Sequence, residues 1–484
     1  MSKIVILGAG ISGHVAAAHL RRKLSKEHEV LVVSPNSNYQ WIPSNIWVGI
    51  GRMKSEQILF PLAPLYKKKG IGFKQAKVVT FHPEGDQELD KPYVVVEHVT
   101  GRKNREKVTY DYLINATGPK LNFEATEGLK PGTNKAYSVC TYSHANHAWE
   151  ALEKLIQEMK QGKKAKILIG TGHAKSTCQG AAFEYILNVE QELRRHNVRD
   201  KAEITWIANE HELGDFGMDG MLLSYGGMTM KSKEMVEMVF EDRDIKWIIG
   251  AGVNKIEDGI AHYETLDGDY KTETYDFSML IPAFSGHGFT AYDKVGKDIT
   301  QKLFKGFMIV DADYSPKPYE EWSVQDWPET YQNPSYSNIF APGIAFAPPH
   351  AISKPRKSKN GTPISPSPPR TGMPSGITAK LVADNIIDTI KNEGKTSLHH
   401  KGSMGNMGAA CIASAGYGMT KGSGISITTF PIVPDYNKYP NTQGRKLGKT
   451  FGEIGLAGHW LKLALHYAFL YKAKMKPFWW LIPE

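Results

Sequence analysis

The stretch "KIVILGAGISGHVAAAHLRR" at residues 3–22 limits the possible folds more than any other. An apolar run from Ile4 to Leu7 comes first, as in a buried parallel strand, and three glycines in G-x-G-x-x-G spacing follow it. Such glycines allow a tight turn and a close approach to a pyrophosphate at the N-terminus of the next helix. We therefore expect the chain to open with a Rossmann-like unit that binds a dinucleotide. The expected contacts from this turn are Gly8, Gly10, Ile11, Ser12 and Gly13.

A second strand, turn and helix pattern begins at "KILIGTGHAKSTC", residues 166–178. It keeps Gly170 and Gly172 but has no third glycine, and it adds Cys178 in what should be the first turn of a helix. The dipole at a helix N-terminus lowers the pKa of a thiol and favours the nucleophilic thiolate. This turn is therefore expected to present a nucleophile in place of a nicotinamide site.

Composition narrows the functional class. The formal net charge of +9 over 484 residues is modest, so it does not suggest a nucleic-acid binder, although it suits an anionic membrane surface or anionic substrates. Three cysteines, Cys140, Cys178 and Cys411, form neither a secreted disulfide framework nor a zinc-ligand spacing, and no metal is expected. No apolar run is long enough for a transmembrane helix. Because strand residues start at once, no signal peptide is expected, which favours the cytoplasmic side of the membrane.

Two later segments should return the chain to the first dinucleotide site. "YDYLINATGPK" (110–120) and "SNIFAPGIAF" (337–346) resemble the strand-end turns of flavoproteins with two dinucleotide-binding domains. The resemblance implies an α/β fold in which an FAD domain is interrupted by a second Rossmann-like domain. The expected limits are 1–160 and 301–400 for the FAD domain, 161–300 for the inserted domain, and 401–484 for a C-terminal region. The residues this resemblance places at the FAD are Ala116, Thr117, Gly118, Gly343 and Ile344.

The second strand ends on Ser34, where an acid would ordinarily hold the ribose, so Ser34 is a weaker expected FAD contact. The long Pro- and Ser-rich stretch 347–375 is either a surface insertion or a loop that covers the flavin, with Arg370 near its end. Four further FAD contacts are expected outside the glycine turn, namely Pro43, Ser44, Asn45 and Arg370.

The tail "GLAGHWLKLALHYAFLYKAKMKPFWWLIPE" (455–484) has apolar residues at helical spacing, with His459, Lys462 and His466 on the other face. Lysines then lead into Phe478, Trp479 and Trp480. An apolar helical face beside lysines and tryptophans suits an amphipathic anchor at a membrane surface. The alternative is a helix that docks on the core of the protein itself.

The three cysteines lie in the stretches "SVCTYSHANHAWE" (138–150), "GHAKSTCQGAAFE" (172–184) and "AACIASAGYG" (409–418). Two further stretches are "YQWIPSNIWVGIG" (39–51) and "LGDFGMDGM" (213–221). Together they resemble sulfide:quinone oxidoreductases, and the resemblance covers nearly the whole chain. The resemblance implies that hydrogen sulfide is oxidised at a redox pair, Cys178 and Cys411, beside FAD, and that a membrane quinone accepts the electrons. It also implies that Cys140 contacts the flavin and in some members holds it covalently. It further implies peripheral membrane binding and a homo-oligomer.

Further roles are expected near these cysteines. Glu184, six residues after Cys178, could relay protons, and His144, four residues after Cys140, could act as an acid or base. A flat quinone ring packs well between aromatic side chains, and the candidates are Phe430, Tyr417 and Phe451.

Other readings stay open. A type II NADH:quinone oxidoreductase would share the fold and tail, and Glu210 offers the acid that its second domain would need. A flavin-binding redox sensor without turnover is a second alternative. A cytochrome-linked sulfide dehydrogenase is a third, although that enzyme would be expected to carry an export signal.

Overall fold

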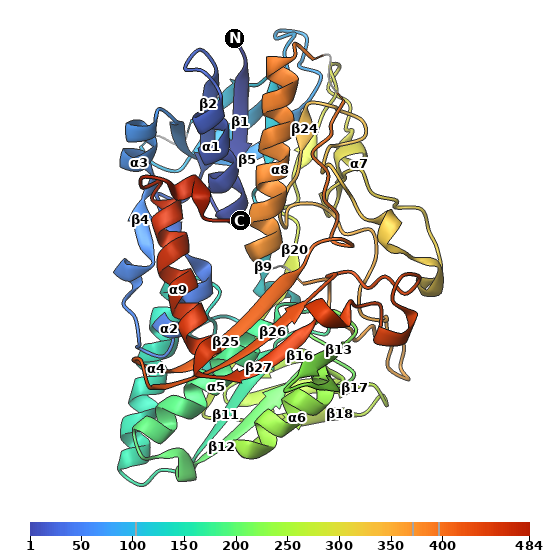
Figure 1. Cartoon of the computed structure of the whole chain (residues 1–484). Coiled ribbons are helices and arrows are strands. Elements are labelled where there is room, and N and C mark those ends of the chain that lie inside the picture. Colours follow the sequence, from blue (N-terminus) through green and yellow to red (C-terminus); the bar gives the residue numbers. More distant parts are fainter. Residues whose placement is uncertain (102–103, 370–371, 395–396) are drawn as a thin grey trace.

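The computed structural model describes residues 1–101, 104–369, 372–394 and 397–484. Arg370 lies outside the described residues. The first sheet, the second sheet and a third sheet formed largely by the C-terminal region are stacked along the long axis of the molecule (Figure 1).

The first sheet is built around β1 (Lys3–Leu7), whose residues Ile4 to Leu7 are fully buried. The neighbours of β1 on both sides are parallel to it, which explains why the strand is apolar on both faces. In spatial order the sheet contains β24 (Ile339–Phe340), β8 (Tyr112–Asn115), β1, β2 (Glu29–Ser34), β5 (Gly72–His82), β6 (Tyr93–His98) and β7 (Arg105–Thr109), with β21 (Thr290–Ala291) also paired to β5.

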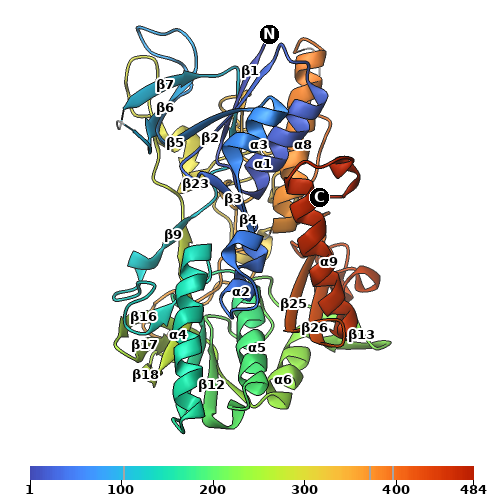
Figure 2. The same cartoon turned by 90° about the vertical axis from the view of Figure 1, so that its left-hand side faces the viewer.

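Helices α1 (Ile11–Lys23) and α8 (Gly372–Lys391) lie side by side against this sheet in both views (Figures 1 and 2). Lys23 of α1 forms an ion pair of 2.6 Å with Asp384 of α8. At the other end of the two helices, a Cβ atom added to Gly372 of α8 would lie 3.1 Å from the side chain of Ile11, so α8 starts beside the glycine turn that opens α1. Between β2 and β5 lie β3 (Asn38–Gln40), α2 (Asn45–Val48), β4 (Leu59–Pro61) and α3 (Leu62–Lys69).

The second sheet is parallel throughout. Its order is β10 (Ala136–Tyr137), β19 (Phe277–Ile281), β11 (Ala165–Thr171), β12 (Ala202–Ile207) and β15 (Ile245–Ile248). Helices α4 (Tyr142–Lys160) and α5 (Gln179–Arg195) run beside each other along it (Figure 2). Helix α6 (Ser232–Asp242) and an antiparallel sheet of β16 (Ala251–Glu257), β17 (Ile260–Thr265) and β18 (Tyr270–Thr274) complete this half.

The strand pairing places the limits of the inserted domain earlier than 161 and 300. The short antiparallel pair of β9 (Lys120–Asn122) and β20 (Ala283–Ser285) marks the two crossings between the halves. Between these crossings β10 and α4 already belong to the second sheet, whereas β21 after them pairs with β5 of the first. The sequence pattern could not show this, because β10 has only two residues.

The third sheet has the order β14 (Met228–Lys231), β13 (Leu222–Tyr225), β27 (Phe451–Gly455), β26 (Lys421–Thr429) and β25 (Ala409–Tyr417). It therefore combines a hairpin of the inserted domain with the C-terminal region. Strand β25 is its edge strand, and α9 (Leu456–Ala473) packs across β25 and β26. None of the helices in the described ranges is long and apolar enough to cross a membrane.

Candidate functional site

The first glycine turn has the shape that a dinucleotide requires. A Cβ atom added to Gly8 would lie 2.3 Å from the carbonyl oxygen of Ala116, and one added to Gly13 would lie 2.0 Å from that of Gly8. Gly10 differs, because a Cβ there would have no neighbour within 4 Å. Gly10 is also the N-cap of α1 and has no side-chain cap, so backbone N–H groups face this open space. These features fit a bound pyrophosphate at the start of α1.

The other expected contacts gather around the same turn. Gly343, with φ of +75°, lies against Ser12, whose hydroxyl would be 2.0 Å from an added Cβ. Gly118 lies near Ile344, because a Cβ atom added to Gly118 would be 3.9 Å from the side chain of Ile344. Thr117 donates to the side chain of Asn115 through both its N–H and its hydroxyl. Ser34, at the end of β2, is buried and accepts a hydrogen bond from the N–H of Asn36.

A short segment around α2 connects the first half to the cysteines. Pro43 and Ser44 form the turn before α2, and the hydroxyl of Ser44 lies 2.7 Å from Nδ1 of His466 on α9. The side-chain amide of Asn45 donates to the carbonyl of Val139 at 2.9 Å, next to Cys140. The Asn45 and Ser44 contacts thus hold the Cys140 segment and α9 against the same turn.

Cys178 and Cys411 come together where α5 meets β25. Cys178 is the N-cap of α5 and has φ of +69°, an uncommon conformation for a residue with a side chain. An added Cβ on Gly180 would lie 2.7 Å from Sγ of Cys411, so only a glycine there leaves room for this thiol. Burial is the main cause that raises the pKa of Cys411, and negative charge on Cys178 adds to it, so the two thiols lie within electrostatic reach of each other. The expected pair therefore shares one site.

A buried ion pair lies beside Cys411. Glu184 of α5 accepts a hydrogen bond from the N–H of Ser414 at 3.2 Å and forms a 2.9 Å ion pair with Lys462 of α9. Lys462 also donates to the carbonyl of Ile412, the residue after Cys411, at 3.1 Å. The side chains of Glu184 and Lys462 are 7% and 13% exposed, so both charges are largely removed from water.

Burial governs the titration of these groups. It raises the pKa of Glu184, while the Lys462 ammonium opposes this shift. Protein packing around Cys411 raises its pKa to about 11, and the Glu184 charge adds to the shift. Cys411 nevertheless keeps exposed surface, so the packing is dense around the thiol without closing it off.

Cys140 and His144 lie at the start of α4. Burial raises the pKa of Cys140 to about 11 and lowers that of His144. The ring of Phe123 meets His144 edge to face with 5.6 Å between the centroids, and Nδ1 of His144 is buried without a hydrogen-bond partner. Their roles as flavin contact and acid or base stay predictions.

The three aromatic candidates do not enclose one ring. Tyr417 ends β25 at the hairpin turn, whereas Phe430 follows β26 near the start of β25. The nine-residue strand between them spans about 27 Å, so Tyr417 does not share a site with Phe430, and its role at a quinone stays a prediction. Phe451 pairs opposite Thr428 in the sheet, and the N–H of Phe430 donates to the Thr450 hydroxyl. Phe430 and Phe451 therefore remain neighbours.

Sequence reasoning missed the part that α9 plays in this site. His459 and His466 are buried, and His459 lies 2.7 Å from the hydroxyl of Ser414, close to Glu184. The face of α9 that carries His459, Lys462 and His466 therefore points into the protein. The signal was present, because three polar residues on one stripe of an otherwise apolar helix need partners when that stripe is buried.

The segment 352–368 packs onto the second glycine turn. The N–H of Ser365 donates to the carbonyl of Ala174, and the N–H of Ser367 donates to that of Ser176. Thr177, next to Cys178, donates through its hydroxyl to the carbonyl of Pro368. This loop therefore packs against the protein. It covers the glycine turn, where a nicotinamide dinucleotide would bind.

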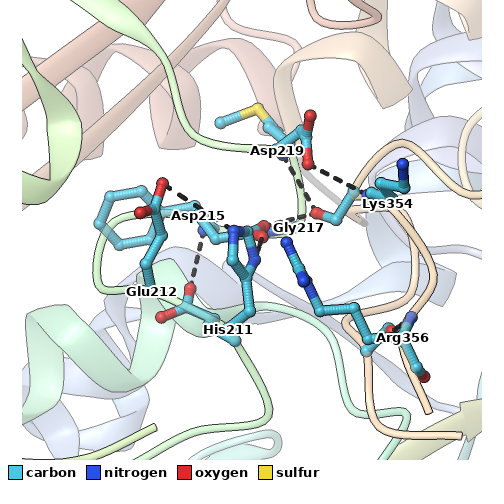
Figure 3. Close-up of polar contacts among 12 residues, drawn as sticks. His211, Glu212, Asp215, Gly217, Asp219, Lys354 and Arg356 are labelled. Carbon is cyan, nitrogen blue, oxygen red and sulfur yellow. Dashed lines mark hydrogen bonds and ion pairs between the residues drawn. The ribbon is translucent and has the colours of Figure 1, made fainter. Parts of the chain in front are cut away.

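The same loop closes over a polar cluster, shown in Figure 3. Asp215 lies there between the ring of His211, at 3.2 Å, and the N–H of Gly217, at 2.8 Å. The N–H of Lys354 donates to Asp219 at 3.1 Å and ties the loop to this segment. Asp215 is fully buried, and Gly217 lies close to the side chain of Gln179, so the cluster adjoins the start of α5.

Comparison with known proteins agrees with this geometry. Residues 2–180 match the family model described as pyridine nucleotide-disulphide oxidoreductase. The sulfide-quinone reductase of Aquifex aeolicus (strain VF5) is 30% identical over 97% of this chain and 91% of the relative, and a mitochondrial sulfide:quinone oxidoreductase of Dictyostelium discoideum is 24% identical over 71% of this chain and 65% of its own length.

Solved structures give the same picture. The Aquifex aeolicus sulfide:quinone oxidoreductase superposes with a TM-score of 0.72 at 28% identity, covering 98% of this chain and 92% of the other. NDH2 from Plasmodium falciparum in complex with NADH reaches a TM-score of 0.60 at 15% identity over 98% of this chain and 96% of the other, which shows the shared fold alone. The chain belongs to the sulfide:quinone oxidoreductase family.

Proposed function

We propose that this chain oxidises sulfide at the Cys178 and Cys411 pair and passes two electrons through a bound FAD to a membrane quinone. The observation that carries the proposal is the meeting of the two cysteines at the junction of α5 and β25, 233 positions apart in the sequence. Family membership supports the overall reaction, and the position of each cysteine supports its role.

The thiol chemistry follows from this arrangement. Hydrosulfide attacks one sulfur of the Cys178–Cys411 disulfide, whose S–S bond breaks, leaving a persulfide on one cysteine and a thiolate on the other. A second hydrosulfide attacks the outer sulfur of the persulfide and releases a disulfane anion with the second cysteine thiolate. Glu184, beside the strand of Cys411, is the carboxyl group proposed to take up and release protons. Bound flavin would supply the two-electron acceptor that the two cysteine thiolates need to return to the disulfide, with the quinone as the final acceptor.

The glycine turn at the start of α1 and the residues around Gly343 and Ile344 would hold the FAD. Cys140 is proposed as the residue that contacts the flavin and links to it covalently. Its support is the hydrogen bond from Asn45 to Val139, which fixes the segment next to the turn before α2.

The quinone is proposed to approach near Phe430 and Phe451, and α9 is proposed to rest on the membrane surface that supplies it. Exposed apolar side chains gather on α9 and the segment that follows, and lysines accompany them. The exposed apolar residues are Trp460, Leu461, Tyr467, Tyr471, Phe478, Trp480 and Leu481. Such a surface binds a bilayer interface, and the lysines favour anionic lipids. Assembly into a homo-oligomer stays a prediction.

The NADH:quinone alternative finds little support in the second domain. The 352–368 loop covers the turn, and Glu210, the acid proposed for the ribose, is buried. Its carboxylate accepts a hydrogen bond from the N–H of Phe216, and burial raises its pKa well above the usual range. A buried Glu210 whose carboxyl group already accepts from Phe216 is a poor ribose ligand.

The proposal is tested by mixing the flavin-loaded protein with sulfide under anaerobic conditions and following flavin absorbance, then adding a soluble quinone. We expect sulfide to bleach the flavin and quinone to restore it, whereas NADH does neither. Cys178→Ser and Cys411→Ser should each slow bleaching at least about a hundredfold, since each removes one half of the disulfide. Bleaching by NADH but not by sulfide would instead favour the alternative enzyme, and sulfide bleaching without recovery would favour the redox sensor.

A further inference from the structure

The strand that carries Cys411 has an unusual environment on its outer side. Because β25 is an edge strand, its outward N–H and C=O groups have no neighbouring strand. Side chains form the hydrogen bonds that a neighbouring strand would form. Glu184 accepts from the N–H of Ser414. Asn188 and Trp47 donate to the carbonyl of Ser414 at 2.9 and 3.3 Å. The ammonium group of Lys462 donates a hydrogen bond to the carbonyl of Ile412 at 3.1 Å. The position of Cys411 therefore depends on side chains from α5, α2 and α9.

Lys462 differs from the other side chains on this strand because it carries a positive charge. It reaches Glu184 and the strand from α9, and the two oxygens of Glu184 are divided between Ser414 and Lys462. A buried carboxylate that lost the cation bonded to it would be strongly disfavoured. Lys462 thus opposes the pKa rise that burial causes at Glu184, and it holds this side chain at a fixed place beside the strand of Cys411.

We propose that Lys462 is a positioning residue for Cys411, which it serves by fixing the charge of Glu184 next to the thiol and by holding the carbonyl of Ile412. This deepens the proposed function, on which the importance of Cys411 rests, but the assignment concerns the thiol itself. It also means that the helix proposed to rest on the membrane delivers a residue to the reacting cysteine.

Other ionisable groups in the described residues also act on this site. On α9, burial lowers the pKa of His466 and the Lys462 charge adds to that shift. Cys178 faces Cys411 from the start of α5, and Arg52 acts on Glu184 from the segment after α2. His459 lies on α9 beside Ser414, and burial lowers its pKa. A change at Lys462 or Glu184 therefore has a predictable sign.

The experiment measures how fast iodoacetamide alkylates Cys411 in the reduced, flavin-loaded protein, with peptide mass spectrometry to identify the site. Only the thiolate reacts, and the pKa of Cys411 lies at about 11, so the rate at about pH 9.5 follows the thiolate fraction. Beyond the effect of burial, the Glu184 charge raises the pKa of Cys411 and the Lys462 charge lowers it. Lys462→Met leaves the Glu184 charge unopposed and should lower the rate about tenfold, or one pKa unit.

Lys462→Arg keeps the cation and should retain most of the original rate. Glu184→Gln removes the anion and should raise the rate of Cys411 alkylation. Lys246→Met is the matched control, because Lys246 forms an ion pair of 2.8 Å with Glu203 but is 63% exposed and lies on β15, at the edge of the second sheet, whereas Cys411 lies in the third. Flavin content and melting temperature identify folded variants.

The proposal is overturned if folded Lys462→Met alkylates Cys411 at the original rate. Should Lys462→Met fail to fold, Glu184→Gln decides, and an unchanged or lower rate there also overturns it. Alkylation requires neither sulfide nor quinone. A failure of this positioning proposal is therefore distinguishable from a failure of the proposed sulfide oxidation. A protein that oxidises sulfide yet shows no rate change keeps its function and loses this assignment.

Discussion

Gly180 and Gly10 are two glycines whose missing side chains serve different partners. Gly10 leaves open space at the N-terminus of α1, whereas Gly180 leaves room for Sγ of Cys411 within the first turn of α5. The G-x-G-x-x-G spacing predicted the role of Gly10 from the sequence. The sequence around Gly180 could not predict the role of Gly180, because the atom that fills the space beside it belongs to a residue more than two hundred positions later.

Gly180→Ala tests the closeness of the two thiols. Alanine favours a helix more than glycine, so α5 should form at least as well, and the added Cβ would displace the Cys411 side chain from its place 2.7 Å away. We expect normal flavin content but sulfide-driven flavin bleaching at least about tenfold slower, since a small misplacement of a reacting group is costly. Stopped-flow absorbance measures the rate.

The matched control for this substitution is Gly448→Ala, where an added Cβ has no neighbour within 4 Å. That variant should keep the original bleaching rate. Equal rates for Gly180→Ala and the parent protein would show that Cys411 does not need its observed position.

Helix α9 combines two faces with different tasks. Its polar stripe packs against β25 and the turn before α2, and its exposed stripe carries Trp460 and Tyr467, which are 45% and 63% exposed. The sequence predicted an apolar helical face and offered two alternatives, an anchor or a helix docked on the core. The helix is docked through its polar stripe, which leaves aromatic residues outside. Periodicity could not reveal this, because it identifies two faces without saying which one meets the protein.

The membrane role of α9 is tested by flotation with vesicles of phosphatidylcholine and phosphatidylglycerol. Trp460→Ser combined with Tyr467→Ser should weaken vesicle binding at least about tenfold, because two exposed aromatic contacts with the interface are lost. The control is Tyr270→Ser, which removes a side chain that is 70% exposed on β18. If the double variant floats as well as the control, α9 does not carry the membrane contact.

At the scale of the whole molecule, the site exists because the C-terminal region folds back onto the inserted domain. Strand β27 pairs with β13, so residues near 224 and 451 belong to one sheet, and β25 then lies along α5. The two glycine turns and the return of the chain to the first domain were predictable from local patterns. This third sheet was not, because pairings between distant segments with small and polar residues leave no periodic signal that names the partner.

The central claim is that Cys178 and Cys411 form a covalent sulfur pair that sulfide opens. The most direct measurement is mass spectrometry of peptides from the oxidised protein, before and after anaerobic addition of sulfide. We expect a bridged peptide containing Cys178 and Cys411 before the addition, and afterwards the separated peptides with one of them heavier by a sulfur atom. Persistence of two unbridged, unmodified thiols throughout, while sulfide still bleaches the flavin, would contradict the account.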